Sequence, residues 1–369
     1  MHWSLQLSLF GFSHTTRDIR RILVVRTDRL GDVVLTLPIL PVLRQCFPDA
    51  YLAMLLKRYT GEIVEGNPCV NELIWYDDGK EPVPFMRMCR IIREKNFDAV
   101  IVVYPRPRLA WLMACARVPL RIGTGYRYYS FLFNRRVFEH RKSAGRHEVE
   151  YNLRLLKELG CGDDQRPEFY IHIGEREKRK IEDLLEMLGI RNNRIVVIHP
   201  GSGGSAREWP IVNFGMLAAR LLSLKNVTVI VTGVRSETKK VEGVVAATAG
   251  KAIPLVDQLS VKDLAALAKT SALFISNSTG PIHIAAALGT PVIGLYPQHT
   301  AMSAKRWGPV ALKKRVFVPE KPLDCDECQS MGGSVCTCMA SIPVEKVYLA
   351  AIDLLGESTT IERKAGVRG

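Results

Sequence analysis

Short apolar runs alternate with amphipathic runs along the first half of the chain. The apolar runs are rich in Val, Ile and Leu and are bounded by turn residues, which predicts buried β-strands. The predicted strands are residues 21–26, 51–56, 72–76 and 98–104. The predicted helices are residues 33–46, 84–95, 106–121 and 148–159, with Pro38 and Pro41 interrupting the first of them. Strands that alternate with helices indicate a parallel, doubly wound sheet.

The same alternation resumes after a mixed-charge helix predicted over residues 175–188. The predicted strands of the second half are residues 194–199, 227–231, 253–255, 272–275 and 292–296. The predicted helices are residues 212–224, 237–249, 261–269 and 344–355. Two α/β units that face each other across a cleft are therefore expected.

The strand at residues 272–275 leads into a small polar turn and then a helix. Ser278, Thr279 and Gly280 leave room for an anion near the free N–H groups of the helix start, and Pro281 suits the first helical position. Open α/β sheets bind ligands at such carboxyl ends of strands. The alternative is an ordinary helix N-cap without a ligand.

The length of 369 residues favours two domains. We predict an N-terminal extension over residues 1–19, a first domain over 20–170, a second domain over 171–345, and a C-terminal helix and tail over 346–369. No apolar run approaches the roughly 18 residues that a membrane span needs, and a secretory signal is not expected.

The formal net charge of +14 is concentrated in one region. Between Pro84 and Arg146, fourteen Lys and Arg residues face three acids. Such a surface attracts nucleic acid, a phosphorylated sugar or an acidic membrane face, unless it is only a solvated surface. No nucleic-acid-binding motif accompanies the charge, so nucleic acid is not an expected partner.

Four of the nine cysteines crowd near the C-terminus in a C-x2-C-x7-C-x-C pattern. They are Cys325, Cys328, Cys336 and Cys338. A structural metal site is one interpretation, although the closing C-x-C is not a standard zinc spacing. Free or packing thiols are the other, and we expect them in preference to a metal.

The turn after the first strand carries Asp28-Arg29-Leu30-Gly31-Asp32 and lacks a dinucleotide fingerprint. Gly31 permits close approach to the backbone. Asp32 stands at a helix start, where it either caps the helix or acts as a general base that takes a proton from an acceptor hydroxyl. The residues alone leave both interpretations open.

A second Gly/Ser turn, residues 200–205, follows the strand at 194–199 and is not a P-loop. Ser202 and Gly203 lie in this turn, whose backbone N–H groups suit a diphosphate. Arg207 then offers a cation for a departing phosphate, unless the segment is a plain linker. His283 lies one helical turn after Gly280 and is either a phosphate donor or a structural histidine.

These patches together resemble glycosyltransferase family 9, the lipopolysaccharide heptosyltransferases. The first patch is residues 26–38, Arg-Thr-Asp-Arg-Leu-Gly-Asp-Val-Val-Leu-Thr-Leu-Pro. The others are residues 199–202 (His-Pro-Gly-Ser) with Trp209-Pro210, and residues 277–289, Asn-Ser-Thr-Gly-Pro-Ile-His-Ile-Ala-Ala-Ala-Leu-Gly. The resemblance extends from Arg21 to about Leu355.

The resemblance implies a GT-B fold, in which two Rossmann-like domains face each other across a cleft. It also implies that the first domain binds the acceptor and the second binds the ADP-sugar. It implies that Asp32 is the general base and Arg207, where the family usually has lysine, the cation near the diphosphate. Phosphate-binding positions match Ser202, Thr279, Gly280 and His283. Leu259 matches the position of a hydrophobic residue that contacts the nucleobase, and Glu237 matches the position of an acid that binds the ribose. Ser278 departs from the acidic residue of heptose-transferring members.

The predicted function is therefore inverting, metal-independent transfer of a sugar, with heptose from ADP-heptose expected, onto a lipopolysaccharide core acceptor. We expect no cofactor, a phosphorylated lipid-linked acceptor, and a cytoplasmic enzyme at the inner face of the bacterial inner membrane. One alternative is a transferase of the same fold that uses another nucleotide sugar for a different surface glycan. The other is a non-catalytic, two-lobed protein that binds anions or nucleic acid.

Overall fold

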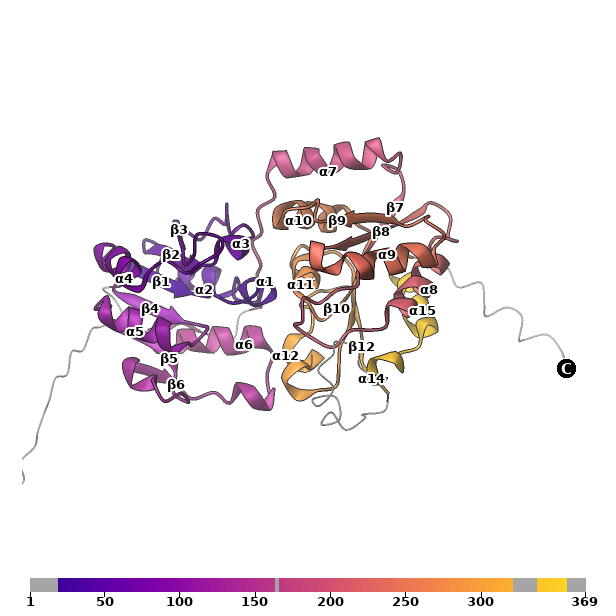
Figure 1. Cartoon of the computed structure of the whole chain (residues 1–369). Coiled ribbons are helices and arrows are strands. Elements are labelled where there is room, and N and C mark those ends of the chain that lie inside the picture. The colour runs from indigo at the N-terminus through magenta and orange to yellow at the C-terminus, as the bar shows by residue number, and fades with distance from the viewer. Residues whose placement is uncertain (1–18, 163–165, 321–336, 357–369) are drawn as a thin grey trace, which may run out of the picture.

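Two six-stranded parallel sheets form the centres of two domains in the computed structural model, which describes residues 19–162, 166–320 and 337–356 (Figure 1). The first sheet has the order β3-β2-β1-β4-β5-β6 and the second the order β12-β11-β10-β7-β8-β9. Both orders are the doubly wound 3-2-1-4-5-6 arrangement when each domain's strands are counted from its own first strand. The predicted α/β fold class with two doubly wound domains is confirmed.

The strands of the first sheet are β1 (Arg21–Val25), β2 (Tyr51–Leu56), β3 (Glu72–Trp75), β4 (Ala99–Val102), β5 (Leu120–Thr124) and β6 (Arg135–Val137). Its helices are α1 (Leu30–Val34), α2 (Ile39–Cys46), α3 (Arg58–Gly61), α4 (Phe85–Glu94), α5 (Pro107–Cys115) and α6 (Glu148–Leu153). The 3-10 helices within residues 19–162 are η2 (Ser130–Leu132), η3 (Arg141–Ser143) and η4 (Arg154–Leu159).

The strands of the second sheet are β7 (Arg194–His199), β8 (Val227–Gly233), β9 (Ile253–Val256), β10 (Leu273–Asn277), β11 (Val292–Leu295) and β12 (Lys314–Phe317). The helices of this half are α7 (Glu175–Met187), α8 (Ile211–Leu221), α9 (Thr238–Ala247), α10 (Val261–Thr270), α11 (Gly280–Ala287), α12 (Ala304–Trp307), α14 (Thr337–Ala340) and α15 (Val344–Leu354). Its 3-10 helices are η5 (Arg235–Glu237) and η6 (Thr300–Met302).

The sequence pattern missed the edge strands β6 and β12 and overextended one helix. The helix predicted over residues 106–121 ends at Cys115, because Arg117 takes a left-handed conformation with φ of 60° and Pro119 follows it. The edge strands carry basic, largely exposed residues, so they lack the apolar run that marks a buried strand. The predicted break near Pro38 is confirmed, since α1 and α2 are separate helices.

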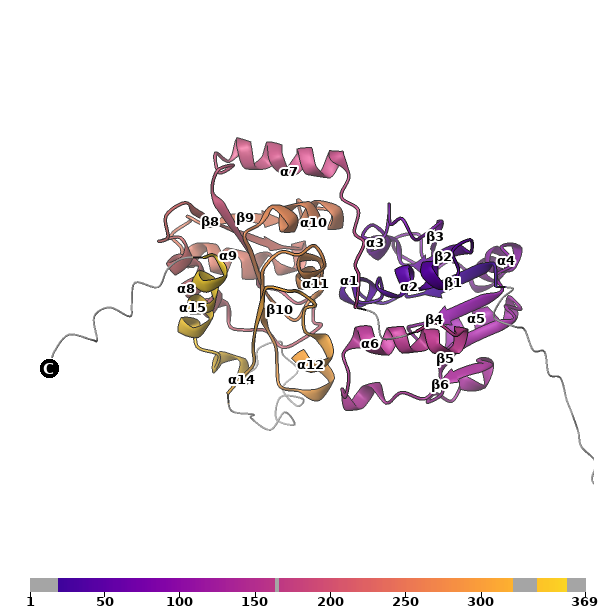
Figure 2. The ribbon, with the colours of Figure 1, turned by 180° about the vertical axis from the view of Figure 1, so that it is seen from behind.

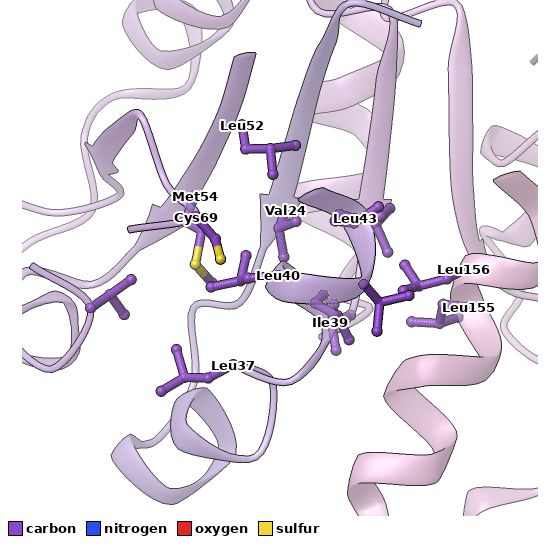
Figure 3. Close-up of a cluster of buried hydrophobic side chains, with 14 of the residues drawn as sticks. Val24, Leu37, Ile39, Leu40, Leu43, Leu52, Met54, Cys69, Leu155 and Leu156 are labelled. Atoms are coloured by element: carbon purple, nitrogen blue, oxygen red, sulfur yellow. The ribbon is translucent and has the colours of Figure 1, made fainter. Parts of the chain in front are cut away.

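The core of the N-terminal domain lies between its sheet and the helices that cover one face of it. Val24 of β1 and Met54 of β2 pack against Leu40 of α2 and Leu156 of η4, and all four are fully buried (Figure 3). Burying each such side chain stabilises the fold by roughly 1.5–3 kcal/mol. The core fixes β1 and therefore the turn that follows it.

The C-terminal domain has a core built around Trp209. The Trp209 ring packs edge to face on Phe214 of α8, and its Nε1 donates a hydrogen bond of 3.0 Å to the carbonyl oxygen of Ile342. Helix α15 buries Val347 and Ala351 in the same cluster. The predicted separate C-terminal segment therefore begins inside a helix that packs within this domain, while residues 1–18 and 357–369 lie outside the described residues.

The two domains lie side by side, with α1 and α6 of the first next to α11 and α12 of the second in both views (Figures 1 and 2). Ile284 of α11 and Ala265 of α10 belong to the same apolar cluster as the N-terminal core. The boundary between the domains is therefore apolar at its centre. Among the described helices, none is long and apolar enough to span a bilayer.

Candidate active site

The starts of α1 and α11 meet at the boundary between the domains. Each helix follows a central strand, β1 or β10, so both begin at the carboxyl edge of a sheet. A Cβ atom on Gly280 would lie 3.1 Å from the backbone nitrogen of Gly31, and one on Gly31 would lie 3.2 Å from the Cα of Gly280. This close approach favours glycine on both sides. The two turns singled out in the sequence therefore lie against each other.

Asp32 lies in the first turn of α1, and its carboxylate pairs with Arg26 instead of capping the helix. The N-cap residue is Arg29, and no side chain caps this helix. Nη2 of Arg26 donates a hydrogen bond of 2.5 Å to Oδ1 of Asp32. The Arg26 side chain is 3% exposed and that of Asp32 is 18% exposed. The carboxylate is thus held firmly yet remains accessible, as a general base requires.

A second carboxylate, Asp28, binds the same guanidinium. Nε of Arg26 donates a hydrogen bond of 2.8 Å to Oδ1 of Asp28. Burial raises the pKa of Asp28 to about 6, with Arg26 opposing the rise and the charge of Asp32 adding to it. Burial alone would lower the pKa of Arg26, but the carboxylates around it raise that pKa above its usual value. Arg26 is therefore a fixed cation between two acids.

Glu148, the first residue of α6, is buried and accepts hydrogen bonds from arginines of both domains. Nη1 of Arg141 lies 2.6 Å from its Oε1, and Nη2 of Arg306 lies 3.0 Å from its Oε2. Nη1 of Arg26 lies 3.5 Å from the same Oε1. Burial would raise the pKa of Glu148, but the three arginines hold it below its usual value. Because Arg306 belongs to α12, Glu148 connects the C-terminal domain to the side chain that holds Asp32.

The Gly/Ser turn after β7 directs its Ser202 side chain inward. Both the backbone N–H and the hydroxyl of Ser202 donate hydrogen bonds to Oε1 of Glu208, at 2.8 and 2.7 Å. Lys240 binds the same carboxylate with its Nζ at 2.6 Å. Both donors of Ser202 therefore bind the buried Glu208 carboxylate in this structure, and the phosphate-binding role of Ser202 stays a prediction.

Glu237 likewise lies beneath the turn. Its Oε1 accepts a hydrogen bond of 3.1 Å from the N–H of Gly203, and its Oε2 lies 3.7 Å from Nε2 of His199. A Cβ atom on Gly201 would lie 1.9 Å from Oε1 of Glu237, so glycine is required there. The Glu237 carboxylate is buried and accepts a hydrogen bond from the Gly203 amide, and its match to a ribose-binding acid stays a prediction.

The turn after β7 is bound to the turn after β10. The hydroxyl of Ser205 donates a hydrogen bond of 3.0 Å to the carbonyl oxygen of Ser278, and the N–H of Trp209 donates one of 2.9 Å to Oδ1 of Asn277. Arg207 is half-buried between these two contacts. The structure therefore brings Arg207 and the start of α11 to the same edge of the C-terminal sheet.

Helix α11 begins without a side-chain cap. Thr279 is its N-cap residue, and its hydroxyl makes no capping hydrogen bond. The ring of His283 packs against Gly31, and burial lowers its pKa to about 3, so the imidazole is neutral. Nδ1 of His283 is buried and has no hydrogen-bond partner among the described residues. The helix start thus retains the free N–H groups that anions prefer, beside one unsatisfied ring nitrogen.

Leu259 is half-buried at the end of the loop after β9, just before α10. It packs on the C-terminal core cluster, and Ser260 caps α10 in the predicted capping box with Asp263.

The cysteines near the C-terminus are only partly described: Cys325, Cys328 and Cys336 lie outside the described residues, and Cys338 is buried in α14. Within residues 19–162, 166–320 and 337–356, no three His, Cys, Asp or Glu residues are grouped closely enough to hold a metal ion.

A cavity of about 270 Å³ opens in the N-terminal domain at the carboxyl ends of β4, β5 and β6. Its wall includes Thr124, Tyr126, Arg127, His140 and Arg141. The rings of Tyr126 and His140 stack with their centroids 4.1 Å apart. Since Arg141 also binds Glu148, the cavity adjoins the charge network around the turn after β1. Aromatic faces and cations in one cavity suit an anionic sugar.

The sequence model of glycosyltransferase family 9 (heptosyltransferase) matches residues 85–335, more than half of the chain. The chain belongs to glycosyltransferase family 9. It is a glycosyltransferase, and the non-catalytic alternative is thereby excluded. The match confirms the resemblance drawn from the sequence.

Two kinds of relative agree with this assignment. Lipopolysaccharide heptosyltransferase 3 of Escherichia coli (strain K12) is 29% identical over 279 residues, which cover 72% of this chain and 79% of the relative. The crystal structure of the glycosyl transferase family 9 protein from Veillonella parvula DSM 2008 superposes with a TM-score of 0.78 at 24% identity, covering 92% of this chain and 98% of that one. The structure of E. coli ADP-heptose LPS heptosyltransferase II superposes with a TM-score of 0.74 at 21% identity, covering 91% of this chain and 98% of that one. The predicted GT-B fold is confirmed.

Sequence reasoning missed Arg26, Glu148 and Arg306. Arg26 had a local signal, since it ends a buried strand two residues before one acid and six before another. Glu148 and Arg306 had none, because their partners lie in distant segments.

Proposed function

We propose that this enzyme transfers a heptose from ADP-heptose to a hydroxyl group of a lipopolysaccharide core acceptor, with inversion and without a metal ion. Relatives named as lipopolysaccharide heptosyltransferases support the substrate class. The observation that carries the proposal is the close contact between Gly31, the residue before Asp32, and Gly280 at the start of α11.

In the proposed reaction Asp32 takes the proton of the acceptor hydroxyl as its oxygen attacks the anomeric carbon. The bond from that carbon to the diphosphate oxygen breaks on the opposite face, and ADP leaves. One displacement inverts the anomeric configuration. Arg26 orients the carboxylate through its hydrogen bond, so that no reorganisation is needed when the hydroxyl arrives.

Charge that develops on the leaving diphosphate is stabilised by the uncapped amides of α11 and by Arg207. A helix start offers aligned N–H donors with a partial positive charge, and guanidinium binds phosphate oxygens in a fixed geometry. Preorganised donors of this kind contribute a large share of catalysis in acyl and phosphoryl transfer. His283, neutral at physiological pH, would add one hydrogen bond through a ring nitrogen.

The acceptor is assigned to the cavity beside Arg127 and Arg141, because these arginines suit an acidic or phosphorylated core sugar. A lipid-linked acceptor lies at a membrane surface, so the proposed place of action is the cytoplasmic face of the inner membrane.

A second candidate donor follows from Ser278, which stands where heptose-transferring members carry an acid. A hydroxyl hydrogen-bonds sugar hydroxyls differently from a carboxylate, which favours testing another nucleotide sugar. Calorimetric titration of the enzyme with ADP-, GDP- and UDP-sugars separates the candidates, since a GDP- or UDP-sugar that binds more tightly than ADP-heptose overturns the heptose assignment.

The decisive experiment incubates the enzyme with ADP-heptose and a defined core oligosaccharide and determines the anomeric configuration of the product by NMR. We expect the linkage opposite to that of the donor, and the same rate with and without EDTA. A retained configuration would rule out a single displacement at Asp32. Loss of activity in EDTA that returns with a divalent cation would rule out metal independence.

A further inference from the structure

One surface of the N-terminal domain exposes large apolar side chains beside arginines. Trp111 on α5 is 47% exposed and Phe131 of η2 is 61% exposed, and the two rings meet edge to face with centroids 6.1 Å apart. Met86 on α4 and Tyr128 are exposed as well. Clustered exposed side chains of this size mark interaction sites. We define the basic–aromatic face as Met86, Arg87, Arg90, Arg108, Trp111, Tyr128 and Phe131.

The elements under this face are tied together. Nη2 of Arg108 donates a hydrogen bond of 2.6 Å to the carbonyl oxygen of Val83, just before α4, and the guanidinium lies 5.9 Å from the Phe85 ring. Nη2 of Arg93 in α4 donates one of 2.6 Å to the carbonyl oxygen of Cys115 at the end of α5. The two helices are therefore joined at both ends, and the face is preorganised.

The face is strongly positive. Arg87, Arg90 and Arg108 are exposed, and the acid exposed on α4 is Glu94, which pairs with Arg90 at 4.0 Å. The other acid between Pro84 and Phe138 is Asp98, whose carboxylate accepts hydrogen bonds from the N–H groups of Arg20 and Arg21. The face therefore complements an anionic surface.

We propose that the basic–aromatic face docks on an anionic lipid bilayer, with Trp111 and Phe131 at the boundary between headgroups and acyl chains and the arginines on lipid phosphates. The amphipathic indole of Trp111 favours this depth, and the apolar ring of Phe131 favours burial toward the acyl chains. Stable peripheral binding takes an apolar and a basic contribution together. The inference rests on the proposed function, in which the acceptor is lipid-linked.

The position of the face fits this orientation. Helices α4 and α5 lie at the end of the N-terminal domain away from the C-terminal domain in both views (Figures 1 and 2). Tyr126 and Arg127 line the acceptor cavity and are followed directly by Tyr128 of the face. The cavity thus adjoins the docked surface, while the C-terminal domain stays in water.

Co-sedimentation of the full chain with lipid vesicles tests the proposal. Vesicles of phosphatidylcholine containing about 30% phosphatidylglycerol should bind the enzyme, more weakly as salt rises, and pure phosphatidylcholine vesicles should bind it far less. The double variant Trp111→Ala/Phe131→Ala should lower partitioning about tenfold. The double variant Arg87→Glu/Arg90→Glu should lower partitioning onto the anionic vesicles by about fivefold or more for each substituted arginine.

Matched controls lie on the C-terminal domain. Val212→Ala/Met216→Ala removes exposed apolar side chains of α8, and Arg235→Glu reverses a highly exposed charge; both should sediment like wild type. All face variants should retain activity on a soluble, delipidated acceptor. The docking proposal is overturned if the wild type does not bind the anionic vesicles or binds both vesicle types equally. It is also overturned if the face variants bind as tightly as the wild type. Absence of transfer by the wild type to the soluble acceptor would instead count against the proposed function.

Discussion

Arg26 and Asp32 are joined by a hydrogen bond of 2.5 Å between Nη2 and Oδ1. Arg26 directly follows the apolar strand β1 and is almost fully buried, so its guanidinium cannot swing away. Asp32 lies in the first turn of α1, at the boundary between the domains. A buried cation thereby fixes one oxygen of an accessible carboxylate. This arrangement matches the task of a base that must be ionised and correctly oriented before the acceptor binds.

Asp32→Ala should lower turnover by roughly two to four orders of magnitude, because the acceptor proton then has no positioned acceptor. Donor affinity measured by calorimetry should stay near wild type. Asp32→Asn can still accept the hydrogen bond from Arg26 and should be equally slow, which separates base chemistry from packing. Asp257→Ala, at an exposed acid paired with Arg235, serves as the control. Near-normal turnover in the Asn variant would show that Asp32 is not the base.

Arg207→Ala should weaken donor binding and lower kcat together, because in the proposed reaction this cation contacts the diphosphate both before and during bond cleavage. A loss of about tenfold or more in each is expected from the strength of charge-assisted hydrogen bonds, about 1.5–3 kcal/mol. Donor titration and steady-state kinetics measure the two effects. Arg235→Ala is the matched control on the same domain. Unchanged kinetics in Arg207→Ala would remove this residue from the site.

Gly31→Ala should separate the starts of α1 and α11. The new Cβ atom would lie 2.9 Å from Cδ2 of His283 and 3.2 Å from the Cα of Gly280, so the contact must widen. Misplacement by about 1 Å can cost on the order of 100-fold in rate, and overpacking costs about 1–3 kcal/mol of stability. Gly162→Ala, where a Cβ meets nothing within 4 Å, should behave like wild type in kcat and thermal unfolding. Equal kcat in both variants would refute a tight contact.

Glu148→Gln should destabilise the protein by about 3–5 kcal/mol, because three arginines lose the buried charge that they share. Urea unfolding measures the change. Glu150→Gln is a stringent control, since Glu150 lies on the same helix but is exposed, with its Oε2 3.9 Å from Nη1 of Arg146. That variant should stay within about 0.5 kcal/mol of wild type. Equal effects would mean that the Glu148 network contributes nothing specific.

His283 should make stability fall as pH falls. Its pKa is lowered by burial to about 3, whereas an unfolded histidine titrates near 6.5, so between these values the unfolded state alone binds the proton. The contribution of neutral His283 to the free energy of unfolding should decline by about 1.4 kcal/mol per pH unit as the pH drops through this window. Above the window this contribution should be fully present. His283→Asn should remove this part of the slope in urea unfolding from pH 7 to pH 4. His172→Asn, at an exposed position, should leave the slope as in wild type.

Much of the molecule was predictable from local pattern. The apolar run at residues 21–25, the capping box of Ser260 with Asp263, and the break near Pro38 each depend on neighbours within a few residues. Gly31 and Gly280 stood out because a glycine in a turn before a helix permits close approach. The sequence also located both turns at carboxyl ends of strands, where doubly wound sheets bind ligands.

The tertiary structure alone decided which of these groups meet. Arg306 and Glu148 are 158 positions apart, and no periodicity in the sequence links them. Local pattern also gave no sign that the Ser202 and Gly203 amides donate hydrogen bonds to Glu208 and Glu237, whose carboxylates folding brings beneath the turn. Short-range spacing fixes helices, strands and turns because backbone hydrogen bonds and side-chain periodicity act locally. Pairing of buried charges depends on which distant segments share a low-dielectric space, and that is set only when the whole chain packs.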